Sequence, residues 1–279
     1  MHYRHSYHAG NFADVFKHVL LCGLLAALNR KDKPWCALDT HAGAGFYDLS
    51  GEGAMRTGEW QDGIGRLAGV QDAPEPLATY LRVVAAGNTP ERVRYYPGSP
   101  QFLLSLAREQ DRVQLCEKVP EVADDLRMNL GRDPRVALHL RDGYEAHALL
   151  PPKEKRGLIL VDPPFERTDE YAAMAEFTRK AVARFAGGIV ALWYPVKNRH
   201  AANGFLRRVG REVERPSLAF EIDNGAQAEG QMHACGVLVV NPPFQFEREM
   251  QPSLKLLERV LAQGPKPQCR FEWVRTEQG

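Results

Sequence analysis

The sequence predicts an α/β protein built on a doubly wound, mostly parallel sheet of seven strands. Short apolar runs alternate with helical patterns along most of the chain, and the last two runs have no helical pattern between them. Strands that alternate with helices form parallel pairs, whereas two strands joined directly are antiparallel neighbours. We therefore expect a parallel sheet that ends in an antiparallel hairpin, with the functional site at the C-terminal ends of the parallel strands.

Local patterns place each of these elements. A first helix is expected at residues 12–31, with Asn11 as its N-cap and Asp14 three residues later. The apolar runs that indicate the five parallel strands are residues 35–38, 112–116, 135–140, 157–161 and 188–193. Further helices are expected at 120–130, directly after residue 143, and at 169–186, and the hairpin strands at 217–222 and 234–240.

The segment between the first two strands is too long for a simple crossover. It covers about seventy residues, whereas a crossover needs roughly a dozen. Helical patterns lie at 58–68 and 75–86, and a third helix follows Tyr95-Tyr-Pro-Gly-Ser-Pro100. We interpret residues 47–95 as a helical insertion beside the site, within a single domain that covers residues 1–279.

Composition excludes several classes of protein. The sequence contains no run of about 18 apolar residues, so no transmembrane helix is expected, and the N-terminus lacks the pattern of a signal peptide. The five cysteines are scattered without a C-x-x-C pair, which favours reduced thiols over a zinc site or disulfides. His2, His5 and His8 precede any rigid element and lack a fourth ligand, so we expect no metal. These features predict a cytoplasmic protein with no membrane partner.

Polar residues follow successive strands of the predicted sheet. Asp39-Thr-His-Ala-Gly43-Ala-Gly45 follows the first strand, and its glycines let a backbone approach a ligand closely. Glu117 ends the second strand, where a carboxylate takes both hydroxyls of a ribose, and Asp142 follows the third. Taken singly, the glycines equally fit a tight turn, and each acid is more often solvated or a helix cap. The series as a whole favours a cofactor derived from a nucleoside.

The fourth strand ends in Asp162-Pro-Pro-Phe165, and these residues suit the methylation of an exocyclic amine. The lone pair of such an amine is delocalised into its ring, so a site must accept hydrogen bonds from both N–H groups. Asp162 supplies one acceptor, and the carbonyl of Pro163, pre-aimed by the restricted proline backbone, supplies the other. Phe165 offers a ring on which an unstacked base can lie. The alternative is a strand stop with a core phenylalanine.

A similar run, Asn241-Pro-Pro-Phe244, ends the last predicted strand. Residue type does not decide between the two runs, because asparagine also accepts hydrogen bonds from an amine. An antiparallel strand delivers its C-terminal end to the opposite edge of the sheet, roughly 20 Å away for seven residues. We therefore expect Asn241 to be structural, its prolines to end the strand and Phe244 to cover the core.

Together these residues resemble the amino-group methyltransferases that carry the motif (D/N)PP(Y/F/W). Over nearly the full length the chain looks like the RlmJ family, which methylates an adenine at N6 in 23S ribosomal RNA with S-adenosylmethionine. The segments that carry the resemblance are Tyr3–Asn11, Lys17-His18, Asp39–Gly45, Tyr95–Pro100 and Leu192-Trp-Tyr-Pro195. The resemblance implies a Rossmann-like methyltransferase fold. Phe165 departs from the more usual tyrosine, which retains stacking but not a hydroxyl contact.

The resemblance also implies roles for individual residues. The positions expected to contact the cofactor are Lys17, His18, His41, Gly43, Gly45, Ser99, Glu117, Asp142, Gly143 and Asp162. Asp162 is also the implied catalytic acceptor, and Tyr3 joins Pro163 and Phe165 on the substrate side. Considered without the family resemblance, Lys17 is expected to be a solvated charge on the surface of the first helix. We expect a monomer whose partner is 23S ribosomal RNA, with Lys197 and Arg199 among its phosphate contacts.

Other functions remain open on the sequence alone. The same chemistry fits an adenine in DNA or the amide of a protein glutamine, although no separate base-reading domain is visible. A non-catalytic protein that binds S-adenosylmethionine or a nucleotide has no need of Asp162 and Phe165. A nicotinamide dehydrogenase is disfavoured, because the third glycine of its fingerprint is replaced by Asp48 and the chain ends in a hairpin.

Overall fold

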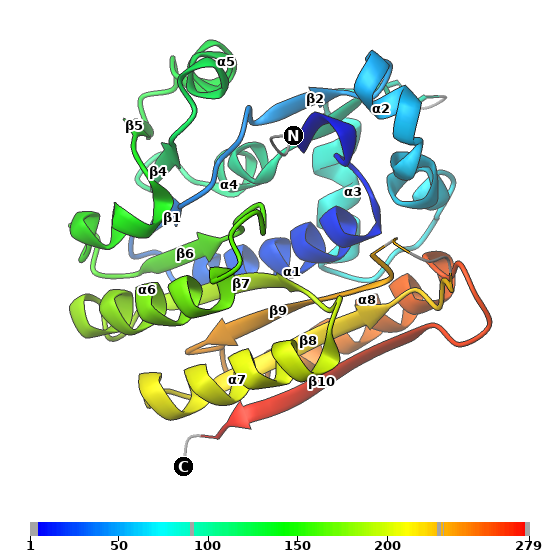
Figure 1. Cartoon of the computed structure of the whole chain (residues 1–279). Coiled ribbons are helices and arrows are strands. Elements are labelled where there is room, and N and C mark those ends of the chain that lie inside the picture. The colour runs from blue at the N-terminus through cyan, green and yellow to red at the C-terminus, as the bar shows by residue number, and fades with distance from the viewer. Residues whose placement is uncertain (1–4, 90–91, 228–229, 231, 277–279) are drawn as a thin grey trace.

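The computed structural model describes residues 5–89, 92–227, 230 and 232–276. Its main sheet has eight strands in the order β10-β8-β9-β7-β6-β1-β4-β5 (Figure 1). The strands are β1 (Cys36–Asp39), β4 (Arg112–Glu117), β5 (Val136–Leu140), β6 (Gly157–Val161), β7 (Ile189–Pro195), β8 (Ser217–Asp223), β9 (Ala234–Val240) and β10 (Gln268–Arg275). From β5 to β7 the neighbours are parallel, whereas β9 is antiparallel to both β7 and β8. The predicted parallel sheet and its antiparallel pair are confirmed.

The predicted fold class and the antiparallel hairpin are confirmed, but the predicted number of seven strands is wrong, because an eighth strand follows the hairpin. Strand β10 pairs antiparallel with β8 and forms the edge of the sheet. Its apolar residues Cys269, Phe271 and Trp273 alternate with polar ones, which is the period of a half-buried strand. Helix α8 (Phe246–Val260) precedes it and also lies outside the predicted elements. This helix contains Pro252, a residue that usually interrupts helices.

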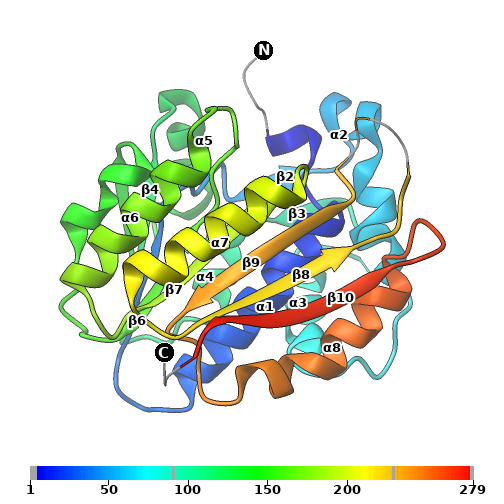
Figure 2. The same cartoon turned by 60° about the horizontal axis from the view of Figure 1, so that its bottom comes forward.

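Helices cover both faces of the sheet (Figures 1 and 2). One face packs against α1 (Phe12–Asn29), α3 (Leu77–Ala85), α4 (Ser99–Leu106), α5 (Pro120–Leu130) and α8, and the other against η4 (Gly143–Leu149), α6 (Glu170–Arg184) and α7 (Arg199–Val213). Strand β6 shows the alternation, since Leu158 and Leu160 join the first core and Ile159 and Val161 join the second. Burial on both faces explains why the parallel strands are apolar at successive positions.

Helix α1 runs through the centre of the first core. It contains 18 residues with a mean hydropathy of 1.5, so by length and composition it is apolar enough to cross a membrane, contrary to the sequence-based expectation. Within the protein 83% of the helix is buried, as is typical of a core helix. Its start is as predicted, because the side chain of Asn11 accepts from the N–H groups of Ala13 and Asp14, each at 3.0 Å.

The long segment after β1 combines short helices with a second, two-stranded sheet. Its elements are β2 (Phe46–Asp48), α2 (Glu52–Thr57), the 3-10 turns η2 (Glu59–Asp62) and η3 (Ile64–Leu67), α3, and β3 (Tyr95–Pro97). The helix predicted at 58–68 is two 3-10 turns, separated at Gly63. A Cβ at Gly63 would lie 2.0 Å from the carbonyl oxygen of Gly10, so the N-terminal segment packs directly against this turn. A Cβ at Gly53 in α2 would likewise lie 3.1 Å from the ring of Tyr7, and Figure 1 shows α2 near the first described residues.

Candidate active site

Four acidic residues, three of them predicted from the strand ends, lie along one edge of the main sheet. Strands β6, β1, β4 and β5 are consecutive neighbours and run in the same direction. They end at, or within two residues of, Asp162, Asp39, Glu117 and Asp142, respectively. The fold therefore brings together side chains that are more than 120 residues apart in the sequence, as their positions after successive strands predict.

The glycine loop after β1 lies across the end of β4. Gly43 and Gly45 have φ values of 60° and 76°, which disfavour any residue with a side chain. The N–H of Gly43 donates to Oε2 of Glu117 at 3.0 Å, and a Cβ at Gly43 would lie 2.3 Å from the hydroxyl of Tyr47. The glycines therefore serve both conformation and close packing. They hold the loop backbone directly beside the carboxylate of Glu117.

Asp39 is a site residue that the sequence did not single out, although it begins the glycine loop. It is fully buried, accepts from the N–H of His41 at 3.1 Å and from the hydroxyl of Ser99 at 2.7 Å. Burial raises the pKa of Asp39 to about 6, against the opposing effect of the Ser99 hydrogen bond. Ser99, one of the predicted cofactor positions, therefore lies beneath the loop and anchors it to the N-terminus of α4.

Asp39 is expected to make stability depend on pH. Because its pKa is higher in the folded protein than in the unfolded chain, the folded state binds more protons between about pH 6 and pH 4. The free energy of unfolding should therefore rise, relative to Asp39→Asn, by about 2 kcal/mol as the pH falls from 7.5 to 4.5. Denaturant unfolding of both proteins at the two pH values measures this difference. An unchanged difference would show that Asp39 titrates normally.

The loop between β5 and η4 packs against the glycine loop. Asp142 caps η4 by accepting from the N–H of Tyr144 at 2.9 Å. A Cβ at Gly143 would lie 2.1 Å from the carbonyl oxygen of Thr40, so only glycine fits between the two loops. The ring of His41 lies edge-on to Tyr144, with 5.3 Å between centroids. Burial lowers the pKa of His41 to about 4, so this imidazole is neutral at physiological pH.

Lys17 reaches the site from α1 and contacts the predicted catalytic acid. Its buried ammonium donates to Oδ1 of Asp14 at 2.9 Å and to Oδ2 of Asp162. Burial by itself lowers the pKa of Lys17, but Asp14 and Asp162 outweigh it and raise the pKa above its ordinary value. Lys17 is therefore a buried cation and not the solvated helix charge that its sequence context alone favours.

His18 lies deeper than Lys17, in the core beneath the site. It is 1% exposed, its Nδ1 is 2.9 Å from the hydroxyl of Tyr96, and its ring packs on Phe102 at 4.6 Å. Tyr96 belongs to the Tyr95–Pro100 segment that carries part of the family resemblance. In this structure His18 therefore connects α1 to β3 and α4, and its predicted contact with a cofactor stays a prediction.

The Asp-Pro-Pro-Phe loop places its aromatic ring on the α6 side of the sheet. Phe165 has a φ of 52° and is partly buried, with its ring edge-on to Tyr171 at 5.2 Å and to Trp193 at 5.7 Å. The hydroxyl of Tyr171 donates to the carbonyl of Pro195 at 2.6 Å, which ties α6 to the end of β7. These contacts fix the position of Phe165. Tyr3, the other predicted substrate-side aromatic, lies outside the described residues.

Asn241 lies at the opposite edge of the sheet, as its antiparallel strand predicts. Its side-chain amide donates to the carbonyls of Ala186 and Gly188, at 3.0 and 2.8 Å, just before β7 begins. The expectation that Phe244 covers the core is wrong, because this side chain is 82% exposed. The chain turns after β9, and Phe246 at the start of α8 is the buried ring instead, edge-on to Phe220.

Replacing Asn241 with alanine is expected to affect stability and not catalysis. The substitution removes two hydrogen bonds and leaves two carbonyl groups without this donor, which costs about 1 to 3 kcal/mol. Chemical denaturation should show this loss, while the activity that the sequence predicts, methyl transfer, stays within about twofold of the wild-type rate per folded molecule. A collapse in turnover at unchanged stability would mean that Asn241, and not Asp162, serves the reaction.

The predicted phosphate contacts have different surroundings. Arg199 donates to both oxygens of the buried Glu221, at 2.8 and 2.6 Å, and Arg270 of β10 donates to the same carboxylate. Arg199 therefore helps to tie α7 to β8 and β10. Lys197 is exposed in the loop before α7. Among the described residues, no group of three His, Cys, Asp or Glu side chains is arranged to hold a metal ion.

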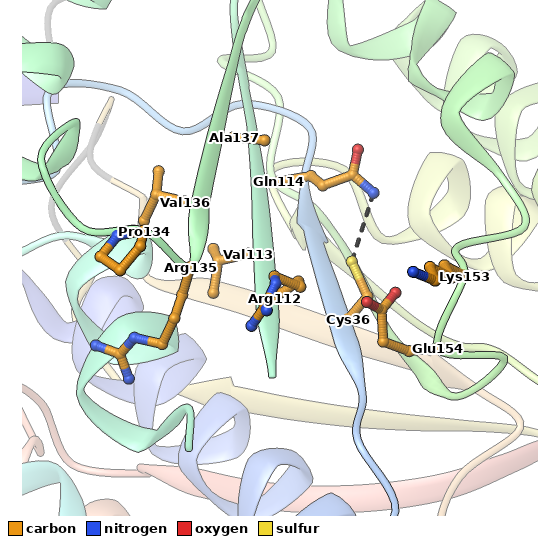
Figure 3. Close-up of a pocket in the computed structure, with 10 residues that line it drawn as sticks. All are labelled: Cys36, Arg112, Val113, Gln114, Pro134, Arg135, Val136, Ala137, Lys153 and Glu154. Atoms are coloured by element: carbon orange, nitrogen blue, oxygen red, sulfur yellow. Dashed lines mark hydrogen bonds between the residues drawn. The ribbon is translucent and has the colours of Figure 1, made fainter. Parts of the chain in front are cut away.

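A cavity of about 260 Å³ lies at the other edge of the sheet, at the N-terminal ends of β1, β4 and β5 (Figure 3). Figure 3 shows Gln114 pointing toward Cys36, and its amide donates to the sulfur at 3.4 Å. The lining residues are Cys36, Arg112, Val113, Gln114, Pro134, Arg135, Val136, Ala137, Lys153 and Glu154. None of them belongs to the predicted site, which occupies the C-terminal ends of the same strands.

Comparison with known proteins identifies the family. Residues 32–275 match the family model described as "Ribosomal RNA large subunit methyltransferase D, RlmJ". The chain belongs to the RlmJ family. It is 40% identical over 277 residues to "Ribosomal RNA large subunit methyltransferase J" of Escherichia coli K12, and 37% identical over 281 residues to the protein of the same name from Haemophilus influenzae. Each alignment covers 99% of both chains.

A solved structure supports this RlmJ architecture. A crystal structure of a protein from Legionella pneumophila, 35% identical in sequence, superposes with a TM-score of 0.88. The match covers 95% of this chain and 98% of the Legionella protein. The resemblance that the sequence motifs indicate is therefore confirmed over nearly the whole chain, including the segment between β1 and β4.

Proposed function

We propose that this RlmJ-family protein transfers a methyl group from S-adenosylmethionine to the N6 amino group of an adenine in 23S ribosomal RNA. The names of the two bacterial relatives support a target in large-subunit ribosomal RNA. The choice of an adenine amine rests on one observation, the position of Asp162. This residue follows β6 beside the glycine loop, and its Oδ2 is held by Lys17.

The residues at this edge fit a cofactor that combines a nucleoside with a cation. Gly43 of the glycine loop has no side chain and lies directly beside Glu117, whose carboxylate would accept from ribose hydroxyls. Asp39, Asp142 and Asp162 add negative charge along the same edge, which suits a sulfonium. S-adenosylmethionine supplies an electrophilic methyl group when it is bound here.

Asp162 would orient the target amine. Among the described residues none donates to its Oδ1, so this oxygen is available to accept from an amino group while Lys17 holds Oδ2. Positive charge develops on the attacking nitrogen, and a fixed carboxylate stabilises that charge more in the transition state than in the ground state. Phe165 would carry the face of an unstacked base from its fixed place beside Trp193.

Glu117→Ala is expected to weaken binding of S-adenosylmethionine by about 1.5 to 3 kcal/mol, because hydrogen bonds to a charged acceptor are lost. Isothermal titration calorimetry measures the change. Glu109→Ala is a matched control, because Glu109 is exposed and precedes β4 at the opposite edge of the sheet. Equal affinities of the two folded variants would remove Glu117 from the cofactor site.

A transfer assay on several acceptors tests the proposed substrate. Labelled S-adenosylmethionine is offered with protein-free 23S ribosomal RNA, assembled large subunits, adenine-containing duplex DNA and ribosomal proteins in parallel. The proposal predicts incorporation into 23S RNA, free or in an assembly intermediate. Label in DNA, or in protein and not in RNA, would assign the same chemistry to a different target.

A further inference from the structure

A network of three charged side chains links the start of α1 to the end of β6. The ammonium of Lys17 stands between the carboxylates of Asp14 and Asp162. The side chains of Asp14 and Lys17 are only 4% and 5% exposed, whereas that of Asp162 is 16% exposed. The network therefore leads from the protein interior to the site, and Asp162 is its outermost member.

Asp14 is fixed by partners on both of its oxygens. Oδ1 accepts from Lys17 one helical turn away, and Oδ2 accepts from the N–H of Gly10 at 2.9 Å. Gly10 is in turn held by Ile64 of the insertion, whose N–H donates to the Gly10 carbonyl at 2.9 Å. The carboxylate of Asp14 is therefore locked in one orientation before any ligand binds, and it fixes the ammonium that contacts Asp162.

The charge of Asp14 has a consequence for Asp162. If Lys17 paired with Asp162 alone, the cation would offset the carboxylate just as positive charge develops on the attacking nitrogen. With Asp14 present, the three side chains together retain one negative charge. The nearest ring of the glycine loop, His41, is neutral at physiological pH and does not offset it. Asp39 on β1, once ionised, adds to it.

We infer that Asp14 is a positioning residue for methyl transfer, which orients Lys17 and offsets its charge, so that Lys17 holds Asp162 in place without cancelling the negative charge of the network. This inference rests on the proposed function of Asp162. A purely structural role is the competing explanation, because an acid in the first turn of a helix also stabilises the helix. The two explanations differ in what they predict for the rate of the chemical step.

The test uses Asp14→Asn and Asp14→Ser, two uncharged variants that need no additional space, together with wild type. Asp111→Asn is the matched control: Asp111 is equally buried and paired with Arg108, but it precedes β4 at the far edge of the sheet. For each protein the melting temperature, the affinity for S-adenosylhomocysteine and single-turnover methyl transfer to 23S RNA are measured. The Asp14 variant that folds is the one used to distinguish a positioning role from a purely structural role.

We expect the Asp14 variants to lower the single-turnover rate by about 10- to 100-fold, by analogy with residues that orient the ligands of a catalytic metal. Cofactor affinity and KM for RNA should change less than threefold, and Asp111→Asn should keep its rate despite a comparable loss of melting temperature. Wild-type rates in the Asp14 variants, or a loss explained by cofactor binding alone, would overturn the inference. Failure of wild type itself to methylate RNA would instead contradict the proposed function.

Discussion

Asp162→Ala is expected to lower the rate of methyl transfer by about 100- to 1000-fold, the cost of losing one preorganised group that stabilises developing charge. Asp162 is the outermost residue of the buried network and directly follows β6. Cofactor affinity should fall far less, because the glycine loop and Glu117 stay in place.

Single-turnover assays with saturating S-adenosylmethionine measure the effect of Asp162→Ala on the chemical step. Asn241→Ala provides the control, since it alters the look-alike run at the opposite edge of the sheet. More than a tenth of the wild-type rate in folded Asp162→Ala would contradict the assignment of this residue as the acceptor.

Lys17→Met is expected to destabilise the protein by about 3 to 5 kcal/mol at pH 8, because it removes the buried cation that both Asp14 and Asp162 contact. The carboxylates of Asp14 and Asp162, which remain in the variant, determine how this loss of stability changes with pH. Without Lys17, the pKa of the buried Asp14 should rise in the folded state, so protonation stabilises the variant as the pH falls. The deficit relative to wild type should therefore be smaller at pH 5 than at pH 8.

Denaturant unfolding at the two pH values tests this prediction. In the wild-type protein the contribution of Lys17 to the free energy of unfolding is constant between pH 5 and pH 8. Because the pKa of Lys17 is raised in the folded state, this contribution is lost only when the pH rises through that folded-state pKa. Lys255→Met, on the exposed face of α8, controls for the loss of a lysine. A deficit below about 1 kcal/mol at pH 8 would show that Lys17 contributes little to the folded state.

The strand ends were predictable because each is marked in the sequence by an apolar run that stops at a polar residue. Glu117, Asp142 and Asp162 follow three such runs, and parallel strands deliver these ends to one edge. The same logic placed Asn241 at the other edge.

Contacts between elements that are distant in the sequence were not predictable in this way. Helix α1 is apolar on most of its surface, so periodicity does not show that Lys17 is buried or that it faces Asp162. Its neighbour Asp14 is indicated only as a first-turn acid. Their pairing depends on how α1 packs beneath β6, 145 residues from Lys17 to Asp162 along the chain.

The C-terminal elements were missed for two physical reasons. Strand β10 lies at the edge of the sheet and is half exposed, so its apolar residues alternate with polar ones and do not form the continuous apolar run by which the other strands were predicted. Pro252 interrupts the usual signal of helix α8, although Phe246, Met250, Leu254 and Leu257 repeat at helical spacing. The exposure of Phe244 follows from this helix, because the buried position belongs to Phe246.

The central claim, that the carboxylate at the end of β6 directs methyl transfer to an adenine amine in large-subunit ribosomal RNA, is tested most directly by identifying the product. 23S RNA incubated with labelled S-adenosylmethionine and either wild type or Asp162→Ala is digested to nucleosides and separated by liquid chromatography with mass detection. We predict label in N6-methyladenosine with wild type and almost none with the variant. Label in any other nucleoside, or equal amounts of N6-methyladenosine from both proteins, would contradict the claim.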